Sequence, residues 1–104
     1  MKKIIRIDKK AAKEIKQFPA LVQAKLKGSL LILERDGKLE EPFAKKIDKE
    51  IFEIRVKSQG QWRALYAYIL ESMVIVLSAF QKKTQKTPID ELEKARRRLK
   101  EYQS

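Results

Sequence analysis

The sequence predicts one α+β domain over residues 1–104, with the elements in the order strand, helix, helix, three strands, helix. Two patterns predict this class. Apolar residues recur at helical spacing before Gly37 and after Pro88, whereas they alternate or run unbroken between Ile51 and Phe80. A chain of this length buries one modest core. We therefore expect a small, mostly antiparallel sheet packed against an N-terminal helical hairpin and a C-terminal helix.

The first half contains a short strand and two helices. Lys2–Ile7 reads as the strand, and Asp8 is a suitable N-cap for the helix that follows. Pro19 suits the first turn of a second helix, which Gly37 ends as its C-cap. Residues 38–50 have an irregular pattern broken by "EEPF", and we expect no regular element there. The apolar stripes of the two helices are Ala11, Ala12, Ile15 and Phe18, then Val22, Leu26, Leu30 and Leu33.

The second half contains three strands and a helix. Ile51–Lys57 alternates in polarity, and "SQGQ" makes a turn before the next strand, Trp62–Leu70. Met73–Phe80 is apolar at nearly every position, as expected of a central strand covered on both faces. Thr87 is expected to cap the last helix, with Pro88 in its first turn. That helix has the apolar stripe Ile89, Leu92, Ala95, Leu99 and Tyr102.

Charge is the strongest signal in the composition. The chain has 25 Lys and Arg against 14 Asp and Glu, a net charge of +11. Such an excess on a small domain predicts a polyanionic partner, above all a nucleic acid, with an acidic protein as the alternative. There is no histidine and no cysteine, so histidine-based and thiolate metal sites are excluded. No apolar run is long enough for a membrane span, the N-terminus does not read as a signal peptide, and we expect a cytoplasmic protein.

Five cations lie on or just after the three predicted strands of the second half. Arg55 and Lys57 share the polar face of the first long strand, and Arg63 follows the turn on its antiparallel neighbour. Lys82 and Lys83 directly follow the third strand. Cations that converge in this way suit phosphate recognition, and crowding would lower the pKa of a lysine enough to make it a usable base. Alternatively each is an ordinary solvated side chain, and Arg55 pairs across the sheet with Glu53.

The aromatic and arginine-rich segments also have structural interpretations. Trp62, Tyr66 and Tyr68 share a strand face, for which core packing is the simpler interpretation. Phe80 either closes the core or stacks on a base. The segment "ARRRLK" is expected to spread Arg96, Arg97, Arg98 and Lys100 over the outer surface of the last helix.

The motifs in the second half resemble those of a known family. In order they are a strand containing "EIR", a small turn, "WRALY", an apolar strand, and "FQKKTQKTP" leading into a helix with the pattern A-x-x-R. Together they cover Glu53 to Tyr102, and "FQKKTQKTP" is the most specific of them. This segment resembles the phage-derived, HigB-like branch of the RelE toxin superfamily. The first half resembles that family only in its helical-hairpin layout.

The resemblance implies a RelE-like fold and a toxin of a type II toxin–antitoxin pair. Such a toxin cleaves mRNA in the ribosomal A site, without metal or other cofactor, and is neutralised by an antitoxin that often has a helix-turn-helix domain. The catalytic residues implied are Arg55, Arg63, Lys82 and Lys83. Residues implied to contact RNA are Lys57, Tyr66, Phe80 and Lys86.

The sequence departs from the family pattern at one place. Many relatives have a histidine and a glycine just before the phenylalanine, where this chain has Ser78 and Ala79. The proton-transfer groups therefore stay open, and so does a second class of function: a non-catalytic basic module that binds RNA or an antitoxin.

Overall fold

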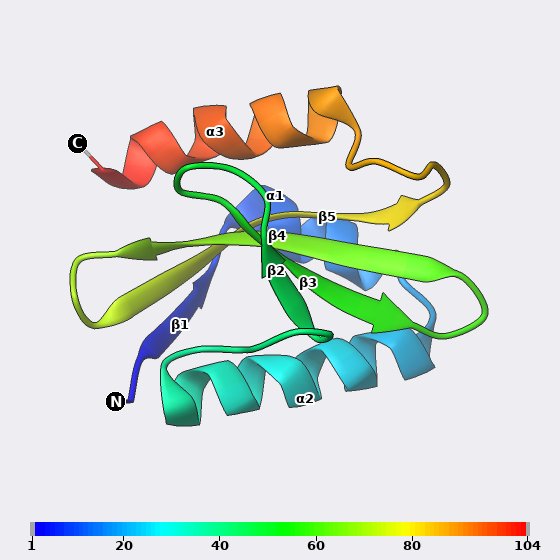
Figure 1. Ribbon diagram of the computed structural model, residues 1–104, viewed down its shortest axis with the longest axis horizontal. Coiled ribbons are helices and arrows are strands. Elements are labelled where there is room, and N and C mark those ends of the chain that lie inside the picture. The colour runs from blue at the N-terminus through cyan, green and yellow to red at the C-terminus, as the bar shows by residue number, and fades with distance from the viewer. Residues whose placement is uncertain (1, 104) are drawn as a thin grey trace.

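The computed structural model describes residues 2–103 as one layered α+β domain (Figure 1). A five-stranded sheet lies between helix α2 on one side and helix α3 on the other. Helix α1 lies beside strand β5. The elements in chain order are β1 (Ile4–Ile7), α1 (Lys9–Lys16), α2 (Ala20–Asp36), β2 (Ala44–Lys46), β3 (Phe52–Lys57), β4 (Gln61–Ile69), β5 (Met73–Lys82) and α3 (Ile89–Gln103).

The sheet has the strand order β1-β5-β4-β3-β2. All neighbouring strands are antiparallel except β1 and β5, which run parallel. The connection from β3 to β4 is a tight turn in which Gly60 adopts a φ of 131°, a conformation that side chains rarely tolerate. The predicted α+β class and the mostly antiparallel sheet are confirmed.

Each face of the sheet buries its own apolar cluster. On the α2 face, Ile54, Trp62 and Tyr66 pack against Phe18 and Leu26. On the α3 face, the cluster consists of Ile51, Leu65, Ala67, Ile69, Ile75, Leu77, Phe80, Ala95 and Leu99. Strand β5 contributes side chains to both clusters, which confirms its predicted place as a strand covered on both faces.

One element differs from the sequence-based expectation. The short strand β2 forms where we expected irregular chain, because its backbone pairs with Phe52–Ile54 and its three residues are too few to give a pattern.

Helix α1 buries Ala11 in the same apolar cluster as α2 and packs Ile15 against it, so the two helices cover one face of the sheet, as expected. Helix α1 follows β1 along the edge of β5, where the Glu14 carboxylate accepts a hydrogen bond from the backbone N–H of Ala79 at 3.0 Å. The pairing of β1 with β5 ends at Val76, so the Ala79 N–H on the edge of β5 has no strand partner. The Glu14 carboxylate accepts its hydrogen bond instead.

An irregularity in the pairing of β4 with β5 changes which way the end of β5 faces. Leu65 pairs with Ser78, but Tyr66 pairs with Val76, so β5 has one extra residue. Up to Val76 the even-numbered residues of β5 belong to the α2 cluster, whereas Phe80 belongs to the α3 cluster. The bulge therefore turns Phe80, and with it Lys82, to the α3 face.

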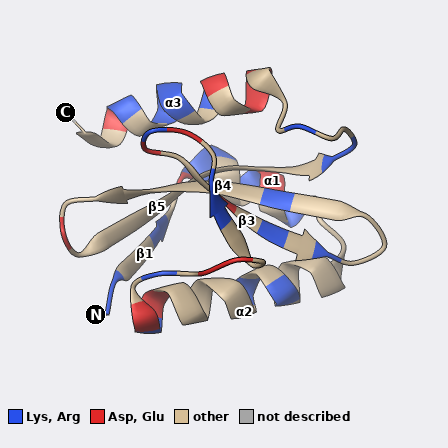
Figure 2. Ribbon diagram, in the orientation of Figure 1, with Lys and Arg blue, Asp and Glu red and all other residues tan. Residues whose placement is uncertain are grey.

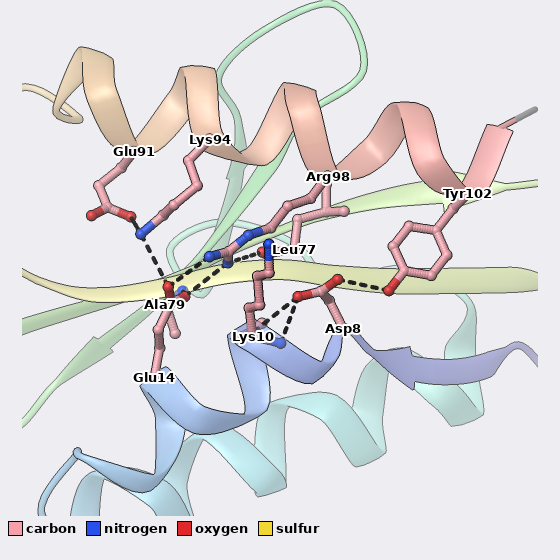
Figure 3. Close-up of polar contacts among 10 residues, drawn as sticks. Asp8, Lys10, Glu14, Leu77, Ala79, Glu91, Lys94, Arg98 and Tyr102 are labelled. Carbon is pink, nitrogen blue, oxygen red and sulfur yellow. Dashed lines mark hydrogen bonds and ion pairs between the residues drawn. The ribbon is translucent and has the colours of Figure 1, made fainter.

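Helix α3 is fixed to the start of the chain by polar contacts (Figure 3). Arg98 donates to both carboxylate oxygens of Glu14, at 3.1 and 3.0 Å, and to the Leu77 carbonyl at 2.7 Å. Lys94 donates to Glu14 at 3.0 Å, and the Tyr102 hydroxyl donates to Asp8 at 2.7 Å. The expectation of four outward-facing cations is therefore wrong for Arg98, which is 9% exposed. The Leu77 carbonyl and the Glu14 carboxylate satisfy the buried guanidinium of Arg98. These partners cannot be identified from the apolar stripe of the helix.

Asp8 also makes hydrogen bonds at the start of α1. As predicted, it caps the helix, with Oδ1 accepting from the backbone N–H groups of Lys10 and Ala11.

Across residues 2–103, no helix has the length and apolar character needed to cross a membrane.

Candidate functional site

Two rows of side chains cross three strands at one end of the sheet. Arg55 on β3 lies opposite Arg63 on β4, which lies opposite Phe80 on β5. In the next row, Lys57, Gln61 and Lys82 pair in the same way. Opposite residues of an antiparallel pair point to the same face, so both rows lie on the face that α3 covers elsewhere. Figure 2 shows Lys and Arg on the ends of β3 and β4 and on the β5–α3 connection.

A buried carboxylate organises the first row. Glu53 is fully buried, and its Oε1 lies 3.3 Å from Nε of Arg55 and 3.4 Å from Nε of Arg63. Its Oε2 accepts a hydrogen bond from the Thr87 hydroxyl at 2.7 Å. Glu53 therefore balances the two opposed arginines and ties the β5–α3 connection to the sheet. Thr87 was expected to cap α3, but its hydroxyl is committed to Glu53, and the carbonyl of Pro88 accepts the first helical N–H, from Leu92.

Arg63 forms the floor of the site. It is 7% exposed, and its guanidinium donates to the Trp62 carbonyl at 3.0 Å and to the Gln61 amide oxygen at 3.1 Å. Burial lowers the pKa of Arg63 below its usual value, the Glu53 carboxylate opposes that shift, and the Arg55 charge adds to it. Because an arginine stays protonated even so, Arg63 is a desolvated cation with a fixed orientation. Such a group favours an anion that reaches it.

Arg63 lies between two hollows in the surface. One, of 460 Å³, is lined by Gln61, Arg63, Lys82 at the end of β5 and the first residues of the β5–α3 connection, including Lys83. The other, of 680 Å³, lies between α2 and β3 and is lined by Arg55 and Lys57 as well as Gln61 and Arg63. The structure thus places Arg63 beside Arg55 and Lys57 in one hollow and beside Lys82 and Lys83 in the other.

Three residues predicted to contact RNA are placed less favourably. Tyr66 is fully buried and stacks on Phe52, so it offers no surface to RNA; burial also raises the pKa of its phenol. Phe80 is 9% exposed and packs in the α3 cluster, so it closes the core. Lys86 is exposed but does not line either hollow, and its carbonyl accepts from the Thr84 hydroxyl.

Two residues of the site were not identified from the sequence. Glu53 was considered only as a surface partner of Arg55, yet it contacts both arginines from within the core. Gln61 was not considered at all, although it touches Arg63 and lines both hollows. The available signal for Glu53 was its position two residues before Arg55 on a strand that pairs with the arginine of "WRALY".

The arrangement suits the binding of a phosphate. A planar guanidinium at the floor and primary amines on the adjacent loop provide the bidentate and point-charge contacts that phosphate oxygens accept. Among residues 2–103, no three acidic side chains group closely enough to hold a metal ion.

Comparison with protein families gives one match that covers most of the chain. The profile of the family described as "Phage derived protein Gp49-like (DUF891)" matches residues 13–100. The chain belongs to this Gp49-like family. No curated protein matched the sequence.

Solved structures of RelE proteins share the fold of this Gp49-like chain. An arginine-to-alanine double mutant of E. coli toxin RelE in the free state superposes with a TM-score of 0.73 at 21% identity, over 95% of this chain and 99% of that one. RelE from the archaeal RelE–RelB complex of Pyrococcus horikoshii gives 0.63 at 18% identity, over 80% and 98%. The toxin–antitoxin complex RelBE2 of Mycobacterium tuberculosis gives 0.62 at 17%, over 79% and 100%. At these identities the likeness establishes the RelE-like fold.

Proposed function

We propose that this Gp49-like protein is the toxin of a type II toxin–antitoxin pair, of the HigB-like branch, and cleaves mRNA in the ribosomal A site. One observation carries the proposal. Arg55 and Arg63 lie opposite each other on neighbouring strands, and Arg63 lines the same hollow as Lys82 and Lys83. The RelE fold of the chain and the presence of antitoxins in several solved RelE structures support the assignment.

The proposed reaction uses the RNA as its own nucleophile and no metal. The ribose 2′-oxygen bonds to the adjacent phosphorus, and the bond from phosphorus to the 5′-oxygen breaks. The products are a 2′,3′-cyclic phosphate and a 5′-hydroxyl. Arg55 and Arg63 stabilise the negative charge that develops on the phosphoryl oxygens. Lys82 or Lys83 takes the proton of the 2′-hydroxyl or gives one to the leaving oxygen, and each such transfer typically contributes ~10²–10⁴-fold.

The proposal includes a location and a partner. The toxin acts in the cytoplasm, where ribosomes present mRNA, and its cognate antitoxin carries a helix-turn-helix domain. The net charge of +11 favours both a polyanionic substrate and an acidic segment of the inhibitor.

The test is to map RNA 5′ ends in a translating extract with and without the protein. We expect new ends inside codons at the A site, reduced at least ~10²-fold by Arg63→Ala. Arg97→Ala is the matched control, because Arg97 is an exposed arginine on α3 away from both hollows. If both variants cut as the parent does, Arg63 has no part in the reaction.

The burial of Arg63 favours a second candidate, a module that binds RNA without cutting it. With 7% of Arg63 exposed, the exposed lysines of the β5–α3 connection would supply most contacts with RNA. In that case the extract would show no new 5′ ends, while the protein would bind RNA with an affinity that falls steeply with salt.

A further inference from the structure

The 680 Å³ groove between α2 and β3 extends the candidate site in one direction. It shares Gln61 and Arg63 with the smaller hollow that contains Lys82 and Lys83. A strand of RNA that crosses Arg63 would therefore occupy one hollow on each side. The groove is large enough for a nucleotide beside the phosphate that Arg63 would hold.

One wall of the groove is apolar. It is formed by Ile32 on α2 together with Leu39, Pro42 and Phe43 from the connection between α2 and β2. Phe43 is 58% exposed and Ile32 is 41% exposed, which is unusual for large apolar side chains gathered at one place. An exposed aromatic ring beside a cationic site is suited to stacking on a base.

The lining of the groove is also cationic. Lys25 from α2 lines it together with Arg55, Lys57 and Arg63, and the lining includes no Asp or Glu. Positive charge of this density beside an apolar wall complements a base with its flanking phosphates.

The edge of β3 in the groove is poorly suited to pairing with an added peptide strand. The Arg55 N–H donates to the Phe43 carbonyl at 2.8 Å, and the Lys57 carbonyl accepts from Lys25 at 3.4 Å. An incoming strand would have to displace these contacts to form its own ladder. A nucleotide needs no backbone ladder, so the edge favours RNA over an extended peptide.

Polar groups in the groove are available to read a base. Gln61 accepts from Arg63 through its amide oxygen, which leaves its amide N–H groups to donate. The Ser29 hydroxyl also lines the groove, from the α2 side.

We propose that this groove binds the nucleotide next to the scissile phosphate, with its base stacked on Phe43 and its far phosphate held by Lys25 and Lys57. The inference deepens the proposed function and rests on it for the identity of the substrate. It makes Phe43 and Gln61 the residues that select which base lies beside the cut.

The test measures binding of a labelled RNA of about six nucleotides, methylated at its 2′-hydroxyls so that it cannot be cleaved. We expect Phe43→Ala to weaken binding ~10-fold, as loss of one stacked base does. Leu31→Ala is the matched control, since Leu31 is 55% exposed on α2 and does not line the groove. Lys25→Ala should reduce the salt dependence of binding by about one phosphate contact. Lys27→Ala, two residues along the same helix, faces a different surface hollow and should have the smaller effect. Circular dichroism verifies that each variant is folded.

The possible outcomes separate this inference from the proposed function. If Phe43→Ala weakens binding but the parent protein never cuts mRNA, the groove stands and the nuclease assignment fails. If the parent cuts mRNA, while Phe43→Ala binds the RNA like Leu31→Ala and keeps the same cleavage positions, the nuclease stands and the groove inference is wrong. If Phe43→Ala binds RNA like the parent but no longer binds an acidic antitoxin peptide, the groove inference is also wrong.

Discussion

At the scale of single residues, Glu53 determines how the candidate site is held together. It places one buried negative charge against two arginines that face each other across β3 and β4. Without that charge, Arg55 and Arg63 would repel each other, and the buried Arg63 would lack its counterion. The carboxylate thus allows two cations to lie side by side where an anion can bind.

Replacing Glu53 by Gln tests this arrangement. The amide keeps an oxygen for the Thr87 hydroxyl but removes the charge that balances the arginines. We expect the free energy of unfolding in urea to fall by about 3 kcal/mol, the cost of breaking a buried ion pair. Added sulfate should restore more stability to Glu53→Gln than to the parent, because the anion takes the place of the carboxylate. Equal stability of the two proteins would show that the arginines do not need Glu53.

At the scale of elements, α3 is fixed by charge as well as by its apolar stripe. Arg98 and Lys94 reach the Glu14 carboxylate, whose other contact is the edge N–H of Ala79 (Figure 3). The same carboxylate therefore connects α1, β5 and α3. Loss of any one of these contacts affects the packing of all three elements.

Two neighbouring arginines on α3 allow a matched test of that connection. Arg98→Ala leaves Glu14 without its main partner, and we expect about 3 kcal/mol less unfolding free energy. Arg97→Ala removes an exposed charge and should change stability by less than about 0.5 kcal/mol. Urea denaturation of both variants measures the difference. Similar midpoints would indicate that the apolar stripe alone holds α3.

The sequence was sufficient to predict the elements because their apolar periods are regular. It was also sufficient to bring Arg55, Arg63 and Lys82 to one end of the sheet, since strand order and hairpin turns follow from the pattern. It did not reveal the bulge in β5, because the extra residue lies in an unbroken apolar run and changes no period. It assigned Arg98 to solvent and Thr87 to a helix cap because the partners of both residues, Glu14 and Glu53, are distant in the sequence.

At the scale of the whole molecule, two carboxylates couple stability to pH. Burial raises the pKa of Glu14, but hydrogen bonds from Arg98, Ala79 and Lys94 outweigh it and hold the pKa below the usual value. Burial likewise raises the pKa of Asp8, and the bonds from Tyr102 and the helix N–H groups outweigh it. A lowered pKa in the folded state stabilises the fold above the unfolded-state pKa, and this contribution is lost as the pH falls through the folded-state pKa.

We therefore expect the urea midpoint to be constant near neutral pH and to fall below about pH 4.5. Glu14→Gln should be less stable than the parent at pH 7 and should lose less on acidification, because it has one such carboxylate fewer. Urea titrations at several pH values compare the two slopes. Parallel curves for the two proteins would mean that Glu14 has no part in the pH dependence.

The contacts between the two ends of the chain also bear on the timing of synthesis. Asp8 and Glu14 find their partners 94 and 84 residues later, and β1 pairs with β5 across most of the sequence. Because α3 is synthesised after all five strands, the α3 face of the sheet stays uncovered until this helix leaves the ribosome. Each newly made molecule therefore passes through an interval in which the strands are available but Glu14 and Asp8 still lack their partners on α3.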